Sequence, residues 1–516
     1  MKRLPIGIQT FEEIRTEGYL YVDKTELVYK MTHEYKYVFL SRPRRFGKSL
    51  LCSTLKSYFE GRKDLFEGLK VMEQEKEWRQ YPVLLVSLAS VKGGTVEDFN
   101  ERASGQLLSY EQKINVTQTT ENLGERFRRL IVNNYEQTGE KVVVIIDEYD
   151  APLLTVLHDD EKLQEMRTCV RSFFSCLKDC DPYLRFVFLT GVSKFSQLSI
   201  FSELNNLKKI SMVPDYSTIC GMTQQELETQ MRPWVERLAE KQEMTIEEAL
   251  ETLKHNYDGY HFAEDLTDVY NPFSLLNAFA AGKISDYWFD TGTPSFLIQM
   301  LRKFNTDIRE IEGSIARAAD FDAPAENMKS VLPLFYQSGY LTIKGYSRIG
   351  DVYTLGIPNH EVRIGLMYSL TPYYVCEDGL RTSNAILRAT MGILEGDMEG
   401  ALQIYQSFLS TIPYAENASS EGHYQTLLYV LFSLLGGAPD LHTEVRTATG
   451  RIDMVLATKT DIYVLELKVD RPAQEALDQI DQKGYLIPYA SDQRTLHKVG
   501  IAFSTKTRTL SEWIIQ

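Results

Sequence analysis

Residues 37–59 narrow the choice of folds more than any other part of the sequence. They begin with Tyr37–Leu40, an apolar run of strand length, and end with Leu50–Phe59, where apolar residues recur at helical spacing. The loop between these runs ends in the triplet Gly-Lys-Ser at residues 47–49. A phosphate-binding loop requires this order of strand, loop and helix, because the loop amides and the helix N-terminus direct partial positive charge at the phosphates. The order therefore predicts a nucleotide-binding α/β domain.

The triplet also predicts which atoms would bind a nucleotide. We expect Lys48 to reach the β and γ phosphates and the hydroxyl of Ser49 to hold Mg²⁺. The usual first glycine of such a loop is absent, because Arg42 occupies its position. The arginines at positions 42, 44 and 45 have two interpretations. They could stabilise charge in the transition state, or they could form a solvated basic loop, which is the interpretation we favour.

Two further apolar runs end in polar side chains that the same site could use. Val142–Ile146 is followed by Asp147 and Glu148, and a third run ends just before residues 190–194, which include Ser193. In a parallel sheet these ends form the ligand-binding edge. We expect Asp147 to hold Mg²⁺ through water, as in a Walker B strand, and Glu148 to polarise the attacking water. Ser193 would sense the γ-phosphate or, alternatively, cap the following turn. The residues expected to bind ATP are Arg45, Phe46, Gly47, Lys48, Ser49, Leu50, Asp147 and Ser193.

The C-terminal region contains a second group of charged residues. Thr449–Ala457 and Asp461–Val469 both alternate like strands; Asp453 lies in the first, and Glu466 and Lys468 share one face of the second. If the two strands pair as a hairpin, Asp453 lies near Glu466, and the two carboxylates repel each other unless a divalent cation sits between them.

Such a cation, Mg²⁺ or Mn²⁺, would polarise a phosphodiester, and Lys468 would orient the attacking water or neutralise developing charge. The alternative is an ordinary two-stranded edge with a solvent-facing Glu–Lys pair. The candidate catalytic residues of the chain are thus Glu148, Asp453, Glu466 and Lys468, and the candidate metal ligands are Ser49, Asp147, Asp453 and Glu466.

Several strings resemble one bacterial family, the AAA-ATPase-like proteins that carry a C-terminal PD-(D/E)XK nuclease domain. The strings are Arg42–Ser49, Ile146–Asp150, Leu189–Ser193, Tyr257–Phe262, Tyr270–Ser274, Tyr287–Pro294 and Gln337–Leu341. The resemblance spans nearly the whole chain and makes an arginine at the first glycine position usual. It implies an αβββαβ nuclease core with the catalytic triplet Asp453, Glu466 and Lys468. It also implies that Glu421 and Gln479 match polar residues of the flanking helices.

Shifts between strand and helix periodicity divide the chain into three regions. Residues 1–285 are expected to form the P-loop domain, with helices around Thr223–Leu253 as its lid. Residues 286–395 are mainly helical with a hairpin near Tyr340–Leu355, which the resemblance makes winged-helix-like. Residues 396–516 form the nuclease-like domain. The expected fold class is α/β, with an AAA-like parallel sheet, a helical middle region and a second α/β domain.

Charge and cysteine content limit the partners. With 71 acidic and 56 basic residues the net charge is -15, which opposes adhesion to nucleic acid over the whole surface. Leu441–Gln516 is neutral by contrast, and residues 494–510 carry basic side chains and no acid. This stretch fits a solvated strand surface or, alternatively, a confined edge that contacts phosphates. The expected nucleic-acid partner is DNA rather than RNA. Six scattered cysteines, and the lack of a signal peptide or membrane-spanning stretch, favour a cytoplasmic protein without a membrane partner.

The sequence therefore predicts an enzyme in which ATP binding and hydrolysis gate a Mg²⁺-dependent nuclease. Two alternatives stay open. One is an ATP-dependent switch whose nuclease-like domain only binds a partner. The other is a motor or remodeller assembled as a homo-oligomer, in which an arginine of a neighbouring subunit would complete the site near Lys48 and Glu148.

Overall fold

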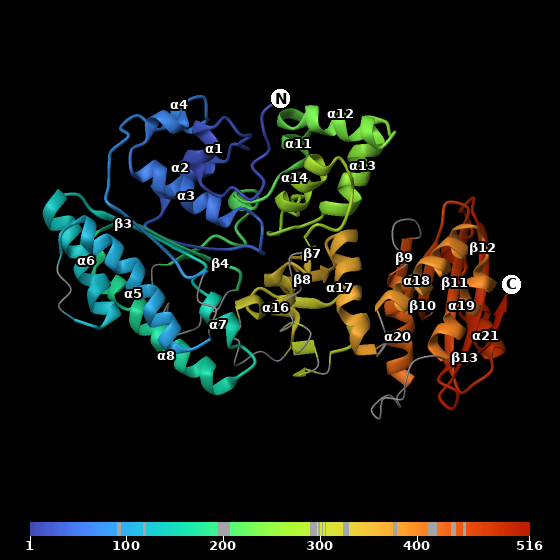
Figure 1. Ribbon diagram of the computed structural model, residues 1–516. Coiled ribbons are helices and arrows are strands. Elements are labelled where there is room, and N and C mark those ends of the chain that lie inside the picture. The colour runs from blue at the N-terminus through green and yellow to red at the C-terminus, as the bar shows by residue number, and fades with distance from the viewer. Residues whose placement is uncertain are drawn as a thin grey trace. The chain divides into compact units, whose positions relative to one another are not determined.

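The chain forms two compact units in a computed structural model (Figure 1). Unit 1 comprises Met1–Phe304 and Gly313–Glu361, and unit 2 comprises Asn305–Glu312 and Val362–Gln516. The expected α/β fold class is confirmed, whereas the division into three regions stays a prediction. The structure describes residues 1–89, 94–116, 120–193, 207–288, 297, 300–301, 303–304, 306–322, 330–374, 379–410, 421–434, 440–446 and 450–516.

Unit 1 is built around a parallel five-stranded sheet in the order β2-β3-β4-β1-β5. Its strands are β1 (Tyr37–Ser41), β2 (Val83–Ser87), β3 (Val142–Asp147), β4 (Leu184–Gly191) and β5 (Lys208–Lys209). β1 and β3 are buried along their whole length, as is typical of parallel strands covered on both faces, and this explains their continuous apolar runs. Because β4 lies between β1 and β3, the carboxyl ends of these three strands meet at one edge.

Among the described residues, nine α-helices precede or connect the first four of these parallel strands. They are α1 (Phe11–Thr16), α2 (Thr25–Glu34), α3 (Lys48–Phe59), α4 (Val71–Gln74), α5 (Val96–Lys113), α6 (Leu123–Thr138), α7 (Ala151–Thr155), α8 (Asp160–Phe174) and α9 (Cys176–Asp179). α3 packs against β2 and β3, α5 against β2, and α6 against β3. α6 has well-defined ends, because the Asn122 side chain accepts a hydrogen bond from the Glu125 amide and Gly139 closes the helix in the left-handed region.

Four more helices of unit 1 follow, of which the first three occupy the region expected to form a lid and the fourth packs against the second and third. They are α11 (Gln224–Gln230), α12 (Arg232–Lys241), α13 (Ile246–Tyr257) and α14 (Pro272–Ala281). Their shared core includes Trp234, Leu253 and Tyr270, all buried. Thr223 and Thr245 begin α11 and α13 with capping boxes, which fix where these helices start.

Residues 313–361 pack with unit 1 as α16 (Leu332–Ser338) and an antiparallel sheet in the order β6-β8-β7. The strands are β6 (Ile315–Arg317), β7 (Thr342–Ser347) and β8 (Val352–Gly356), and the last two form the expected hairpin. His261 ties β7 to the lid region, since its ring nitrogens lie 2.6 Å from the carbonyl oxygen of Ile343 and 2.7 Å from Oδ1 of Asp268. These contacts give His261 a structural role.

Unit 2 contains a mixed sheet in the order β13-β12-β11-β10-β9. Its strands are β9 (Asp440–Arg446), β10 (Arg451–Ala457), β11 (Asp461–Val469), β12 (Thr495–Ser504) and β13 (Thr509–Ile515), and its helices are α17 (His360–Tyr374, which starts in unit 1), α18 (Gly379–Leu394), α19 (Met398–Ser410), α20 (Glu421–Ser433) and α21 (Ala473–Lys483). Only β11 and β12 pair in parallel, and α21 connects them and packs on both. The order α20-β9-β10-β11-α21-β12 is the predicted αβββαβ core. Within the residues described, no helix combines the length and apolarity needed to cross a membrane.

Candidate functional site

The loop after β1 presents main-chain amides at the start of α3. Gly47 is the N-cap residue of α3 and lies in the left-handed region at φ 90°, which favours glycine. It offers no side chain to cap the helix, so the first amides of α3 are available to an external anion. Ser49 and Leu50 follow on the wall of a cavity that Arg45 and Phe46 also line. The loop thus has the geometry of a phosphate cradle.

Lys48 is held across this loop by main-chain oxygens. Its Nζ donates hydrogen bonds to the carbonyl oxygens of Arg42 at 3.0 Å and Pro43 at 2.9 Å, and the residue is buried. Burial lowers the pKa of Lys48, and the neighbouring charges of Glu148 and Asp147 oppose that change. Among the described residues the ammonium makes no direct ion pair, so phosphate oxygens would be its strongest ligands.

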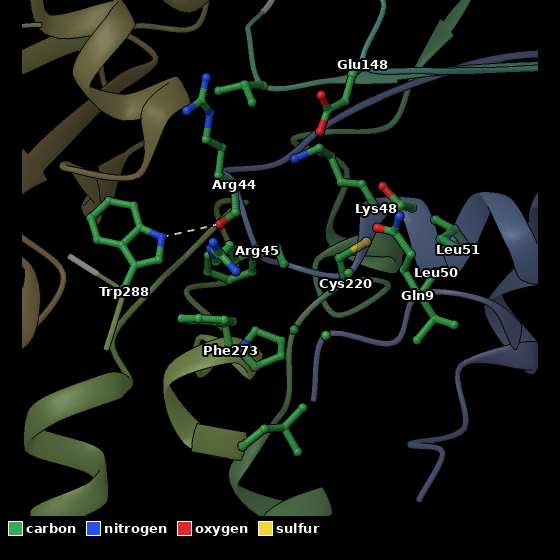
Figure 2. A pocket seen from close by; sticks show the side chains of 18 of the residues that line it. Gln9, Arg44, Arg45, Lys48, Leu50, Leu51, Glu148, Cys220, Phe273 and Trp288 are labelled. Atoms are coloured by element: carbon green, nitrogen blue, oxygen red, sulfur yellow. Dashed lines mark hydrogen bonds between the residues drawn. The ribbon is translucent and has the colours of Figure 1, made fainter. Parts of the chain in front are cut away.

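The two acids at the end of β3 differ in their surroundings. Asp147 is buried, and its Oδ1 has no hydrogen-bond partner within the described part of the chain. A buried carboxylate oxygen without a donor is costly, and a divalent cation held directly or through water would satisfy it. Glu148 lies in the left-handed region at φ 50°, a strained position for a non-glycine residue, and Figure 2 shows its carboxylate directed toward the Lys48 ammonium. Burial raises the pKa of Glu148, opposed by the charge of Lys48.

Asp150, which the sequence analysis did not select, organises the end of β4. Its carboxylate accepts hydrogen bonds from the amide of Val192 and from both the amide and the hydroxyl of Ser193, the last two at 2.6 and 2.5 Å. Tyr149 Oη donates to the carbonyl oxygen of Ser193. Burial raises the pKa of Asp150, and the bonds from Ser193 oppose that rise. The Ser193 hydroxyl is thus engaged by Asp150, its contact with nucleotide stays a prediction, and Lys194 lies outside the described residues.

The expectation of a solvated basic loop is wrong for Arg42. Its guanidinium is buried and donates to main-chain oxygens, including those of Ser211 at 2.8 Å and Tyr216 at 2.9 Å, and it stacks on Phe262 at 4.1 Å. Arg42 therefore anchors the start of the loop to the main chain around Ser211 and Tyr216. This anchoring explains why the loop can begin with arginine instead of glycine.

A cavity of about 940 Å³ adjoins the loop (Figure 2). Its lining comes from residues 5–9, 20–22, 44–51 and 219–222, the first turns of α14, and the side chains of Glu148, Trp288, Ser338 and Tyr340. The Arg45 guanidinium packs on the Phe273 ring at 3.9 Å, and Trp288 Nε1 donates to the carbonyl oxygen of Arg44 at 3.4 Å. Three strings without an assigned chemistry, those containing Phe273, Trp288 and Tyr340, therefore contribute cavity wall. Their only sequence signal was similarity to the family.

The second site lies in unit 2, where β10 and β11 pair antiparallel. Met454 opposes Leu465, so Asp453 falls beside Glu466 as expected. Asp453 Oδ2 accepts a hydrogen bond from the Leu467 amide at 2.9 Å, and Glu466 Oε1 lies 3.3 Å from Lys468 Nζ.

Gln479 of α21 completes this group from outside the hairpin. It donates to Glu466 and accepts from Lys468 at 2.7 Å. The structure thus brings the predicted triplet together with Gln479, whereas the side chain of Glu421 lies outside the described part.

Burial raises the pKa of both carboxyls, and at Glu466 the charge of Asp453 adds to the effect. Glu466 Oε2 is buried and has no hydrogen-bond partner among the described residues. Two raised pKa values and a carboxylate oxygen without a donor fit a divalent cation at this position. No group of three or more His, Cys, Asp or Glu side chains is arranged to hold a metal ion in the part of the chain that the structure describes, so main-chain oxygens or waters would supply the remaining ligands.

Arg309 is a site neighbour that sequence reasoning missed. It belongs to the short segment Asn305–Glu312 of unit 2, whose 3-10 turn Ile308–Glu310 contacts α20 and β9. The guanidinium pairs with Asp307, and its charge opposes the rise in the pKa of Asp453 that burial causes. Because the segment lies far upstream of the nuclease-like region, no local pattern could have placed it there.

The basic side chains of residues 494–510 are partly neutralised by neighbouring carboxylates. Arg494 pairs with Asp492 at 2.7 Å and Lys498 with Asp481 at 2.9 Å, and both carboxylates therefore compete with any phosphate for these side chains. Because exposed ion pairs are weak, a polyanion such as nucleic acid could still displace these carboxylates from the two basic side chains.

Comparisons with known proteins agree with this division of sites. Residues 5–201 match the family described as "Predicted AAA-ATPase", and residues 419–513 match the PD-(D/E)XK nuclease superfamily. A protein of Azotobacter chroococcum mcd 1, described as an uncharacterized protein in the vnfD 5' region, is 35% identical over 529 aligned residues, which cover 100% of this chain and 99% of that relative. The first match contains the loop, Asp147 and Glu148, and the second contains Asp453, Glu466 and Lys468.

Proposed function

The chain belongs to the AAA-ATPase-like family with a PD-(D/E)XK nuclease superfamily domain, and from that premise we propose that it hydrolyses ATP in unit 1 and cleaves nucleic acid in unit 2, the first reaction gating the second. The observation that carries the proposal is common to both sites. Each has a lysine beside two acids, one of which has a buried carboxylate oxygen that no described residue donates to: Asp147 in unit 1 and Glu466 in unit 2.

In unit 1 the cradle, the lysine and the acids suit a nucleoside triphosphate. The amides of α3 and Lys48 would bind the β and γ phosphates, and Asp147 with Ser49 would hold Mg²⁺, which neutralises phosphate charge when bound. Glu148, whose pKa burial raises, would orient the attacking water and accept its proton. The cavity has room for a base and ribose next to the cradle.

In unit 2 the carboxylates suit hydrolysis of a phosphodiester. Asp453 and Glu466 would hold Mg²⁺ or Mn²⁺, which lowers the pKa of bound water when present. Lys468 is fixed by Glu466 and Gln479, so its ammonium is positioned to orient the attacking water or to neutralise charge that develops on the phosphate. The proposed substrate is the phosphodiester backbone of nucleic acid, DNA rather than RNA, as the sequence led us to expect.

The contacts at the start of α17 support the proposal that nucleotide binding controls cleavage. Glu361, in the first turn, is buried and accepts hydrogen bonds from the Trp288 amide at 2.8 Å and the Ser274 hydroxyl at 2.7 Å. Trp288 lines the nucleotide cavity and Ser274 follows Phe273, which also lines it. From Val362 onward the same helix belongs to unit 2. A nucleotide that moves Trp288 or Phe273 would therefore bias the anchor of this helix.

The test is cleavage of labelled single- and double-stranded DNA and RNA by the purified full chain with Mg²⁺ or Mn²⁺, with and without ATP. A double variant, Asp453→Ala with Lys468→Ala, is the matched control for cleavage, and Glu148→Gln is the control for ATP hydrolysis. We expect cleavage that needs the triplet and responds to ATP, and ATP turnover that falls about 10²-fold or more in Glu148→Gln. Cleavage that persists in the double variant would place the nuclease elsewhere or in a contaminant.

A second outcome would support an ATP-dependent switch or remodeller in which the nuclease-like domain only binds. That outcome is ATP hydrolysis without cleavage of any substrate, together with retention of labelled DNA by wild type and by the double variant alike. Sizing with and without a non-hydrolysable ATP analogue then distinguishes a monomeric switch from a homo-oligomer.

A further inference from the structure

The three arginines of the phosphate loop have different surroundings. Arg42 is buried and holds main-chain oxygens, so it has no freedom to meet a ligand. Arg45 is exposed but packs its guanidinium on Phe273 of α14, which links the loop to the lid region. Only Arg44 remains for a role inside the cavity.

Arg44 combines a fixed main chain with an uncommitted side chain. Its carbonyl oxygen accepts a hydrogen bond from Trp288, and its side chain is exposed and makes no hydrogen bond or ion pair within the described residues. Both Arg44 and Glu148 line the cavity, and Figure 2 shows the Arg44 side chain extending away from Arg45 and Phe273.

We propose that Arg44 is a catalytic residue, which stabilises the charge that develops on the γ-phosphate during ATP hydrolysis and acts from the same chain. The proposal rests on the proposed ATPase function. An arginine that enters such a site from a neighbouring subunit or partner raises hydrolysis by orders of magnitude. Here the loop itself supplies a guanidinium on the cavity side, held by its backbone at a defined place.

The reaction balances without a further reactant. The water oxygen bonds to the γ-phosphorus as the bond from that phosphorus to the β,γ-bridging oxygen breaks, and the electron pair leaves on the β-phosphate of ADP. The water proton passes to Glu148 and then to the inorganic phosphate released. Arg44 neutralises the γ-phosphate oxygens throughout, and Lys48 does the same between the β and γ phosphates.

The experiment compares steady-state ATP hydrolysis by Arg44→Ala, Arg44→Gln and Arg44→Lys with wild type. We expect kcat to fall about 10²–10³-fold in Arg44→Ala and Arg44→Gln, since an arginine in this role contributes 10³-fold or more elsewhere, with KM for ATP changed less than about threefold. Arg44→Lys should recover part of kcat. Arg348→Ala, at an exposed arginine of the β7–β8 turn, is the matched control and should behave as wild type.

Calorimetric binding of a non-hydrolysable ATP analogue shows that each variant is folded and separates binding from chemistry. If kcat of Arg44→Gln stays within twofold of wild type, or if its loss is explained by weaker analogue binding alone, the proposal is wrong. Wild type that binds but does not hydrolyse ATP would instead overturn the proposed function, so the two failures are distinguishable.

Mixing variants tests the claim that the arginine acts within its own chain. Arg44→Ala keeps its own Lys48, and Lys48→Ala keeps its own Arg44. We expect their mixture to hydrolyse ATP no faster than the two variants apart, and specific activity of wild type to be independent of protein concentration. Recovery of activity in the mixture would overturn the proposal in favour of an arginine supplied by a second copy.

Discussion

The site of unit 1 and the site of unit 2 use the same types of side chain in opposite ways. Each combines one lysine with an aspartate and a glutamate, and each leaves one buried carboxylate oxygen without a donor in the described structure. In unit 1 the lysine bonds to main-chain carbonyl oxygens of its own loop. In unit 2 the lysine bonds to the side chains of Glu466 and Gln479.

This difference shows what each site requires of its ligand. Carbonyl oxygens carry no full charge, so Lys48 keeps its positive charge available for phosphates. Lys468 is already paired with Glu466, and its charge is partly balanced until a cation binds the carboxylates. Under the proposed function, the first site would therefore attract an anion directly, whereas the second would need a metal to release its lysine for chemistry.

The largest expected effect comes from removing each lysine in turn. Lys48→Ala should lose measurable ATP binding and hydrolysis, and with them the ATP-dependent part of cleavage, because the gate acts downstream of the nucleotide. Lys468→Ala should lower cleavage about 10²-fold or more while ATP turnover stays within twofold of wild type. Calorimetry with the ATP analogue and a labelled-DNA assay on both variants measure this asymmetry. Equal loss of both activities in Lys468→Ala would show that the sites do not work separately.

The sequence was most informative where a site is encoded by neighbouring residues. The loop that ends in Gly47 and Lys48, and the strand that ends in Asp147, could be predicted because their chemistry follows directly from short segments. The strand pairing of Asp453 with Glu466 also followed from period-two alternation once a hairpin was assumed, and the register confirmed it.

Contributions from distant segments could not be predicted. Trp288 and Tyr340 reach the cavity beside the Lys48 loop, and Arg309 reaches the neighbourhood of Asp453, only through tertiary packing that no local periodicity records. Arg42 was misjudged for a related reason, because its carbonyl partners Ser211 and Tyr216 lie far along the chain. An arginine beside a phosphate loop looks solvated until those partners are known.

A glycine substitution tests how far unit 1 depends on these distant segments. A Cβ on Gly339 would lie 2.7 Å from Cβ of Pro43 in the phosphate loop, whereas a Cβ on Gly350 would meet only Val352 at 3.8 Å. Both glycines have φ of +87°, so alanine costs about 1–2 kcal/mol of backbone strain at either position. Gly339→Ala should be destabilising by about 1–3 kcal/mol more than Gly350→Ala because of overpacking. Urea unfolding of both variants gives the difference, and equal losses would refute the close packing on Pro43.

Glu361 offers a pH-dependent test of the anchor at the start of α17. Burial raises its pKa from 4.5 to about 7, with bonds from Ser274 and Trp288 opposing the rise. The folded chain therefore keeps the proton that the unfolded chain releases, and this contribution to stability is complete below pH 4.5 and lost as pH rises through 7. The loss is on the order of 3 kcal/mol, because each unit of difference between the pKa values of the folded and the unfolded chain corresponds to about 1.4 kcal/mol.

Glu361→Gln mimics the protonated acid and should remove this part of the pH dependence. Urea unfolding at pH 5.5 and 8 should show the variant gaining stability relative to wild type at the higher pH. Glu247→Gln, at an exposed glutamate of α13, is the control and should follow wild type at both values. A Glu361→Gln curve parallel to wild type would mean that Glu361 is already ionised in the folded chain.

The smallest expected effect concerns metal binding at the site of unit 2, which contains Lys468. Burial and the charge of Asp453 raise the pKa of Glu466 to about 7, so below that pH a divalent cation must displace a proton. Affinity for Mn²⁺ should therefore rise about tenfold between pH 6 and pH 8, measured by calorimetry on the full chain without nucleotide. Glu466→Gln should lose this binding, and Glu148→Gln, which alters only the site of unit 1, should keep the same pH dependence. Affinity that does not change with pH would mean that Lys468 already holds Glu466 ionised, and the cation would then have to displace the lysine instead of a proton.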